Sequence, residues 1–185
     1  MKMLKKLLAV VLTGAMALTL FTACGGNAVN DKNIADALND MAKGSLATYT
    51  FKSGTDEQAM AKAIAALPEK DWNITAGGGN NKFSGPVMKI LGLDEGSTNK
   101  TSRFVWCGAV FADEIGVTGQ AYNVMNNILS KDAVNADKLE GEPADIRYIG
   151  TALDTLTIYG KQTTVRIIVV TAPVKGQESQ NHGKA

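Results

Sequence analysis

Apolar residues at helical spacing predict a helix near the start of the folded region. Ile34 and Leu38 are four residues apart, which fits an amphipathic helix over residues 31–43. Asn30 precedes this segment as an N-cap, and Gly44 follows it where a left-handed stop is expected. The opposite face of the helix is charged and is expected to face solvent. It consists of Asp31, Lys32, Asp36 and Asp40.

The same periodicity predicts two more helices. One covers residues 55–67 and ends at Pro68, and the other covers residues 118–130. Thr55 followed three residues later by Gln58 fits a capping box at the start of the first. Their apolar stripes are Met60, Ile64 and Leu67, and Ala121, Met125, Ile128 and Leu129. Each stripe predicts that its helix covers a sheet face rather than joining a separate bundle.

The middle of the chain contains short elements. Residues 46–51 and 72–75 are typical of short strands, and residues 87–91 of one or two helical turns. Residues 103–117 fit either a helix or a strand. Aromatic and β-branched side chains favour a buried strand over residues 103–111.

The last third of the chain predicts a β-hairpin. Residues 155–159 and 163–171 alternate in polarity and flank Gly160-Lys161, which suits a type II′ turn. This turn pairs Leu156 with Val165 and makes one face of the hairpin apolar and the other more polar. The two faces consist of Leu156, Ile158, Val165 and Ile167, and of Thr155, Thr157, Thr164 and Arg166. Further along, apolar residues on the second face indicate that part of it is covered too. They are Ile168 and Val170.

These elements predict one α+β domain over residues 31–174. Its sheet is expected to be mixed or antiparallel, to carry the C-terminal β-hairpin and to be covered by about three helices. Residues 146–149 add a strand, and residues 131–143 form a charged connection. Residues 175–185 are polar and are expected to be a disordered tail. No internal repeat or second domain boundary is visible in the sequence.

The first residues of the chain have the layout of an export signal. Lys2, Lys5 and Lys6 precede an apolar run over residues 7–21, and small residues stand before Cys24. A transmembrane helix needs about 20 apolar residues, which this run does not reach. The segment resembles the signal peptide and lipobox of bacterial lipoproteins, with Phe21 where that pattern more often has leucine.

The resemblance implies cleavage after residue 23 and acylation of Cys24. Residues 1–23 would then be a signal peptide, and residues 24–30 a lipidated tether to the outer side of a cell membrane. The two chains of a diacylglycerol are enough for stable anchoring. The resemblance implies nothing about residues 31–174, which match no family motif.

Charge and length change once the signal is removed. Cleavage after residue 23 leaves 162 of the 185 residues, enough for one domain with a hydrophobic core. Three of the 19 Lys and Arg residues lie in the signal, so 16 remain against 18 Asp and Glu. The chain therefore has no basic field, and we expect no nucleic-acid partner.

The two cysteines predict neither a disulfide nor a catalytic thiol. Acylation of Cys24 leaves Cys107 without a partner. Cys107 lies in the apolar run 104–111, where a free cysteine is expected to be a core residue. A catalytic thiolate needs a nearby base, and the single histidine, His182, is in the polar tail.

Other candidate motifs lack the surroundings that their chemistry needs. The glycine run 77–79 is not followed by Gly-Lys-Ser/Thr, so a turn is expected instead of a phosphate cradle. Ser97 and Lys100 have Ser-x-x-Lys spacing but no helical stripe and no Lys-Thr-Gly companion. Asp94-Glu95 and Asp113-Glu114 are adjacent pairs, which are typical of solvated charge.

Two further site classes are disfavoured by residue type. Trp72 and Trp106 are expected to pack in the core rather than to stack on a ligand. One tail histidine and one buried cysteine make a transition-metal site unexpected, although calcium with oxygen ligands stays open. The sequence thus predicts no catalytic, cofactor-binding or metal-binding residue.

Three classes of function are left open by these observations. The first is a noncatalytic domain that binds a small ligand or a protein at the outer face of a membrane. The second is a small envelope hydrolase without a recognisable motif, and the third is an accessory subunit of an envelope complex. A polar cleft would favour an enzyme, and an exposed apolar patch would favour a subunit.

Overall fold

The computed structural model describes residues 29–45, 48–72, 83–93, 100–112 and 115–177. The α-helices within these ranges are α2 (Asp31–Gly44), α3 (Thr55–Ala65), α4 (Gly85–Ile90) and α5 (Val117–Val124). Shorter helical turns are η1 (Glu69–Asp71), the π-helical η2 (Met125–Leu129) and η3 (Ala136–Lys138). The strands are β1 (Thr50–Ser53), β2 (Arg103–Phe111), β3 (Ile146–Ile158) and β4 (Lys161–Pro173).

The four strands form one mixed sheet in the order β1-β3-β4-β2. β1 runs parallel to β3, whereas β4 pairs antiparallel with both β3 and β2. β3 and β4 are consecutive and form a C-terminal hairpin. The predicted α+β domain with a mixed sheet, a terminal hairpin and about three covering helices is therefore confirmed.

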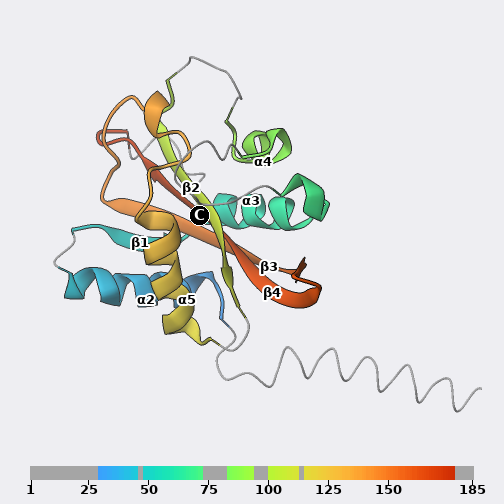
Figure 1. Cartoon of the computed structure of the whole chain (residues 1–185). Helices are drawn as coiled ribbons and strands as arrows, with labels where there is room; N and C mark the ends of the chain where they lie inside the picture. The colour runs from blue at the N-terminus through green and yellow to red at the C-terminus, as the bar shows by residue number, and fades with distance from the viewer. Residues whose placement is uncertain (1–28, 46–47, 73–82, 94–99, 113–114, 178–185) are drawn as a thin grey trace, which may run out of the picture.

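Helices cover both faces of the sheet, as Figure 1 shows, with α2 and α5 on one side and α3 and α4 on the other. The two apolar cores differ in membership because alternate residues of a strand point to opposite faces. The core beneath α3 and α4 includes Ile64, Val87, Leu91, Val105, Val165 and Ile167. The core beneath α2 and α5 includes Ile34, Leu38, Phe51, Val124, Ile149 and Ile168. The second hairpin face is thus covered, as Ile168 and Val170 predicted.

The hairpin turn lies one residue earlier than predicted. Tyr159 and Gly160 form the turn, with φ of 51° and 76°, and a type I′ turn needs positive φ at both positions. Leu156 therefore pairs with Thr163 instead of Val165. The two registers differ by two residues, so each side chain keeps its predicted face. Apolar alternation identifies the faces but cannot distinguish between such registers.

Several boundaries differ from the prediction. The predicted strands at 146–149 and 155–159 form one continuous strand, β3, which ends at Ile158, so that Tyr159 lies in the turn. β1 begins at Thr50, later than the predicted strand at 46–51, of which residues 46–47 lie outside the described ranges. Trp72 follows η1 directly, and residues 73–75 also lie outside.

The predicted elements at residues 31–43, 87–91, 103–111 and 118–130 are present as α2, α4, β2 and α5 with η2. The apolar run in the ambiguous segment is therefore strand, as its β-branched and aromatic residues favoured. α4 begins at a Ser84 cap, whose hydroxyl accepts from the Val87 amide at 3.3 Å. The predicted tail is structured at its start, where the Lys175 amide donates to the Glu142 carbonyl at 2.9 Å. Residues 178–185 lie outside the described ranges.

The helix caps agree with the prediction at one end of α2 only. The Asn30 side chain accepts from the Asn33 amide at 2.9 Å, as expected for an N-cap. Gly44 is still helical, and its φ is not in the left-handed region, so the predicted stop there is wrong. The capping box is also wrong, because Gly54 is the N-cap of α3 and Gln58 bonds elsewhere.

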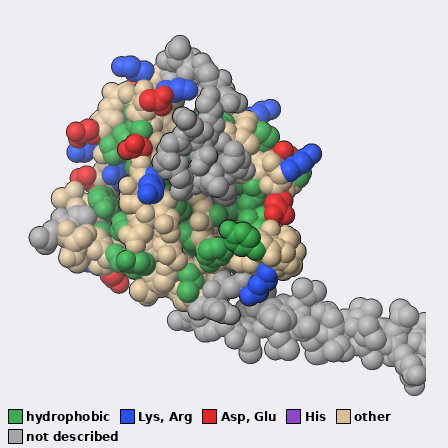
Figure 2. Space-filling model, in the orientation of Figure 1, with side chains coloured by type: hydrophobic (Ala, Val, Ile, Leu, Met, Phe, Trp, Pro, Cys, Tyr) green, Lys and Arg blue, Asp and Glu red, His purple; other side chains and the backbone are tan. Residues whose placement is uncertain are grey.

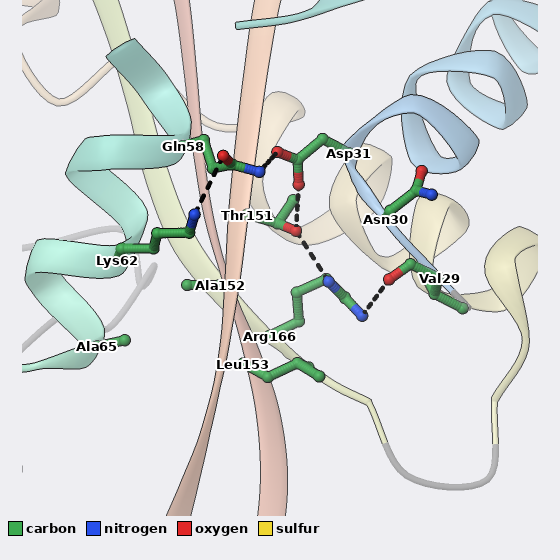
Figure 3. A pocket seen from close by; sticks show the side chains of 10 residues that line it. All are labelled: Val29, Asn30, Asp31, Gln58, Lys62, Ala65, Thr151, Ala152, Leu153 and Arg166. Atoms are coloured by element: carbon green, nitrogen blue, oxygen red, sulfur yellow. Dashed lines mark hydrogen bonds between the residues drawn. The ribbon is translucent and has the colours of Figure 1, made fainter. Parts of the chain in front are cut away.

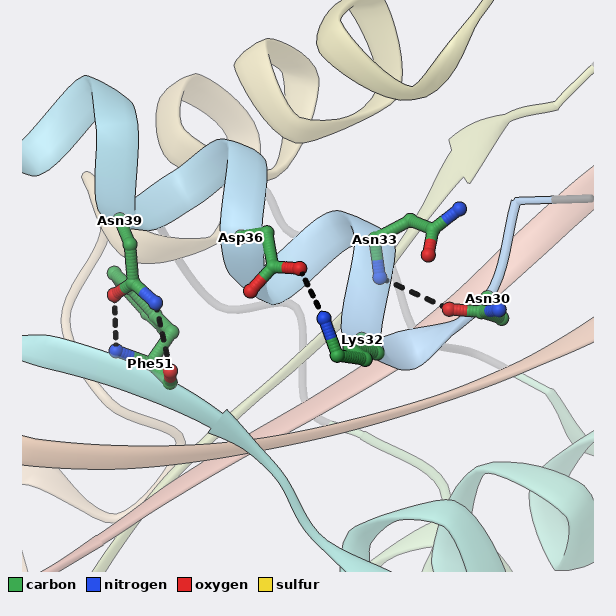
Figure 4. Close-up of polar contacts among 6 residues, drawn as sticks. All are labelled: Asn30, Lys32, Asn33, Asp36, Asn39 and Phe51. Atoms are coloured by element: carbon green, nitrogen blue, oxygen red, sulfur yellow. Dashed lines mark hydrogen bonds and ion pairs between the residues drawn. The ribbon is translucent and has the colours of Figure 1, made fainter. Parts of the chain in front are cut away.

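Asparagine side chains cover part of the outer backbone of both edge strands. Asn39, on α2, donates from its side-chain Nδ2 to the Phe51 backbone carbonyl at 2.9 Å. Its Oδ1 accepts from the Phe51 backbone N–H at 2.6 Å (Figure 4). Asn135 accepts from the Val105 amide at 3.2 Å and donates to the Arg103 carbonyl at 2.8 Å. Covered edges resist pairing with other chains.

β3 differs from these edges because its neighbour β1 is short. β1 pairs with β3 only as far as Ile149, and no other described strand continues on that side. The segment of β3 that begins at Gly150 therefore lies at the edge of the sheet, flanked by α2 and α3. This gap in strand pairing positions the candidate site.

The described surface carries charge of both signs. Figure 2 shows acidic and basic side chains interspersed on one face, which agrees with the near balance in the sequence. None of the described helices is both long enough and apolar enough to span a bilayer.

Candidate functional site

A cleft of about 380 Å³ opens where β3 emerges beyond β1. Residues from the start of α2, from α3 and from β3 and β4 converge on it (Figure 3). Its polar lining consists of Asn30, Asp31, Gln58, Lys62, Thr151 and Arg166. Its apolar lining consists of Val29, Ala65, Ala152 and Leu153. The cleft thus combines a small apolar wall with several hydrogen-bonding groups, as ligand sites commonly do.

Hydrogen bonds link five of these polar residues, all except Asn30, into a continuous network. The Arg166 guanidinium donates to the Thr151 hydroxyl at 2.8 Å, and that hydroxyl donates to Asp31 Oδ1 at 2.6 Å. Gln58 Nε2 donates to Asp31 Oδ2 at 2.8 Å. Thr151 therefore connects a buried cation to a buried carboxylate through a single oxygen (Figure 3).

Arg166 is held on three sides, although it is only 5% exposed. Besides Thr151, it donates from Nε to Gln120 Oε1 at 2.7 Å and from a terminal nitrogen to the Val29 carbonyl at 2.9 Å. Burial lowers the pKa of Arg166, and the nearby Asp31 charge acts in the opposite direction. An arginine so placed keeps its charge, because its ordinary pKa is far above neutral pH.

Asp31 is the main correction to the sequence analysis. It was expected on the solvated face of its helix, but it is only 7% exposed. It lies in the first turn of α2, where a carboxylate is favoured by the helix dipole, and that turn faces Thr151 on β3. Helical periodicity describes one helix and contains no information about which polar partner lies opposite it.

Two other network residues also differ from expectation. Gln58 supports Asp31 instead of capping α3, and it accepts from Lys62 at 3.2 Å. Val29 was assigned to the tether, but its carbonyl accepts from Arg166. Arg166 itself did carry a signal in the sequence. It is a charged residue within the apolar run 165–170, which indicates a buried charge with partners.

Glu57 forms a second buried polar contact beside the cleft. It is 1% exposed, and its Oε1 accepts from the Thr171 hydroxyl at 2.5 Å. Its Oε2 is buried without a hydrogen-bond partner among the described residues. Glu57 is the third residue of α3, where the helix N-terminus favours a negative charge.

The geometry of the cleft suits binding better than proton transfer. Both oxygens of Asp31 already accept hydrogen bonds from side chains of the domain, so this carboxylate is committed to the network. The Thr151 hydroxyl donates to that same carboxylate and accepts from Arg166, so it is also committed to the network. The groups that line the cleft can therefore hold and orient a ligand.

Charge coupling across the network can be measured. We expect Arg166→Met to lower the free energy of unfolding by about 3 kcal/mol, because Asp31 then stays buried without its cation. The double variant Arg166→Met/Asp31→Asn should recover at least about 1 kcal/mol relative to additivity. Urea unfolding of the four proteins in this cycle measures the coupling.

An exposed ion pair provides the control for that cycle. Lys32 and Asp36 are 2.7 Å apart, with side chains 76% and 58% exposed. Their coupling should be no more than about 0.5 kcal/mol, because water screens them. Equal coupling in both cycles would show that Arg166 and Asp31 do not interact as a buried pair.

Cys107 is a core residue, as predicted. It is 4% exposed in the core beneath α3 and α4, and burial raises the pKa of its thiol to about 12. The nucleophilic thiolate is therefore strongly disfavoured at neutral pH.

Thiol labelling tests this placement. In a Cys24→Ser variant Cys107 is the only cysteine, and we expect N-ethylmaleimide to label it only after denaturation. The protonated Cys107 thiol should contribute fully to the free energy of unfolding below pH 9, its ordinary pKa. This contribution should fall as pH rises towards about 12. Cys107→Ala should lack this part of the alkaline loss in urea unfolding. Rapid labelling of the native protein would contradict burial.

The two tryptophans have different environments. Trp72 is 4% exposed and donates to the Leu67 carbonyl at 3.0 Å, which confirms its predicted core position. Trp106 is half-buried, stacks on Phe104 at 5.7 Å between ring centroids and donates to the Lys131 carbonyl. The guanidinium carbon of Arg147 lies 5.2 Å from its ring centroid. The Trp106 ring thus contacts two side chains of the domain, Phe104 and Arg147.

Lys100, the second residue of the Ser-x-x-Lys spacing, is exposed, whereas the other residues named as candidate motifs or sites lie outside the described ranges. These are Cys24, residues 77–79, Asp94-Glu95, Ser97, Asp113-Glu114 and His182. Within the described ranges, no group of three or more His, Cys, Asp or Glu side chains is placed to hold a metal ion. Comparison of the chain with protein-family models, with curated proteins and with solved structures gives no significant match.

Proposed function

We propose that this chain is a membrane-anchored extracytoplasmic lipoprotein whose domain binds a small ligand in the cleft between α2 and α3. The anchor rests on the lipobox-like segment that ends at Cys24. The binding function rests mainly on one observation, the buried Asp31–Thr151–Arg166 network that opens onto the cleft.

A purely structural role accounts less well for this arrangement. Burying an arginine and an aspartate is costly, and apolar residues of similar volume often stabilise a fold as well or better. Here the network is not sealed in the core, because both charged residues line a cleft next to exposed Lys62. Hydrogen bonds among residues of five elements, α2, α3, α5, β3 and β4, hold the groups in place, and such preorganisation lowers the cost of binding.

Cleft filling tests the binding function. We expect Ala65→Trp, in the cleft wall, to abolish the thermal stabilisation produced by any ligand of the full-length protein, found by screening small metabolites. Ala63→Trp is the matched control, because Ala63 is exposed on the same helix and does not line the cleft. Equal responses of the two variants to the ligand would place its site elsewhere and reject the proposal.

Substitution of the acylated cysteine tests the anchor. Because acylation requires the thiol, Cys24→Ser should release the protein from the membrane fraction or leave it as unprocessed precursor. Fractionation with palmitate labelling measures both outcomes. A membrane-bound, palmitate-labelled mature product of unchanged size in this variant would refute the lipoprotein assignment.

A protein partner is the second candidate, and exposed apolar side chains favour it. Tyr159 at the hairpin tip is fully exposed, and Leu153 and Phe111 are 54% and 55% exposed. An accessory subunit of an envelope complex would use such residues. Mass spectrometry of proteins that co-purify with wild type but not with Tyr159→Ser would support this role.

A further inference from the structure

We infer that the cleft between α2 and α3 takes a small anion, a carboxylate or a phosphate, that carries a short apolar group. The inference rests on the small-ligand function proposed above and adds the chemical class of the ligand. It follows from the balance of donors and acceptors, from the charge of the lining and from its apolar wall.

Hydrogen-bond donors exceed acceptors in the lining. Each carboxylate oxygen of Asp31 already accepts one bond, at 2.6 and 2.8 Å. Within the described residues, Lys62 uses one of its three N–H donors, and Arg166 uses three of its five. The two cations therefore have four unused N–H donors for a ligand that offers acceptors, whereas each Asp31 oxygen has one lone pair left for a ligand that offers donors.

The net charge of the lining also favours an anionic ligand. Two cations, Lys62 and Arg166, face one carboxylate, Asp31, so the lining carries a net positive charge. Asn30, the N-cap of α2, also lines the cleft, which places the positive end of that helix dipole there. Lys62 is exposed and has two further N–H donors for the ligand, whereas Arg166 is buried and fixed by three hydrogen bonds.

The apolar wall limits what else the ligand contains. Ala65 and Ala152 have small side chains, and Leu153 is 54% exposed at the cleft. Contact with a short aliphatic group would remove this surface from water. The volume of about 380 Å³ lies at the small end of ligand sites, which favours a compact molecule.

A matched four-carbon series tests the charge preference. Isothermal titration of the detergent-solubilised full chain with butyrate, butyl phosphate, butanol and butylammonium compares two anions, a neutral molecule and a cation of similar shape. We expect at least one of the two anions to bind, with the neutral and cationic compounds at least about fivefold weaker, as for one charge-assisted hydrogen bond. Acetate should bind more weakly than butyrate, because it lacks the apolar group.

Variants locate the binding and identify its source. Lys62→Gln should weaken anion binding by about fivefold or more. Lys70→Gln is the control, since Lys70 is exposed on η1 and does not line the cleft. Competition by soluble dibutyryl phosphatidylglycerol would assign the anion to a lipid headgroup, and failure to compete would assign it to a free small anion.

Three results would overturn the inference. The first is that butanol or butylammonium binds as tightly as the anions or more tightly. The second is that Lys62→Gln leaves the affinity for the anions unchanged. The third is that none of the compounds binds. A neutral ligand that is lost in Ala65→Trp would leave the proposed binding function standing and reject the anion alone.

Discussion

Ile167→Asp is expected to unfold the domain. Ile167 is fully buried on β4, the central strand that pairs with both β2 and β3, and it packs in the core beneath α3 and α4. A carboxylate there would be buried without a partner, at a cost of several kcal/mol or more. Domains have only about 5–15 kcal/mol of net stability, so little or none would remain.

Thr164→Asp, on the same strand, is the comparison. Thr164 lies on the opposite face near the hairpin end, is only half-buried and pairs with exposed Thr155. Its new carboxylate can reach water, and the loss of stability should be at most about 1 kcal/mol. Circular dichroism and urea unfolding measure both variants. Similar losses in the two would contradict the assignment of the strand faces.

Gly150→Ala is expected to lower the free energy of unfolding by more than about 4 kcal/mol, in the exceptional range for a single methyl group. A Cβ at Gly150 would lie 1.9 Å from the Gln58 amide nitrogen and 2.1 Å from the Glu57 carbonyl carbon. Both atoms belong to the backbone of α3, so no side-chain rotation relieves the contact. α3 would have to move away from β3, which strains the hydrogen bonds of Glu57 and Gln58.

Gly44→Ala is the matched control for this substitution. Gly44 is the last residue of α2, and a Cβ there would meet no atom within 4 Å. Because alanine is a better helix former than glycine, the variant should be unchanged or more stable by up to about 1 kcal/mol. Urea unfolding compares the two. A tolerated Gly150→Ala would mean that α3 does not lie against β3 at this point.

Local patterns in the sequence determined the elements and their faces. Ile34 and Leu38 located α2, and Asn30 located its start. The alternation around Val165 and Ile167 assigned both faces of the hairpin correctly, although the turn was misplaced. Burial of Cys107 also followed from its apolar neighbours. These features are predictable because apolar periodicity reports which side of an element leaves water.

The tertiary structure alone decided the register and the candidate site. A two-residue shift leaves every face unchanged, so alternation could not choose between the pairing of Leu156 with Val165 and with Thr163. Asp31 and Thr151 are 120 residues apart along the chain, and Gln58 and Asp31 are 27 apart. Polar side chains have no period that identifies their partners. Whether Asp31 faces water or a buried hydroxyl depends on which strand lies opposite, and only the packing of α2 and α3 around the uncovered part of β3 determines that.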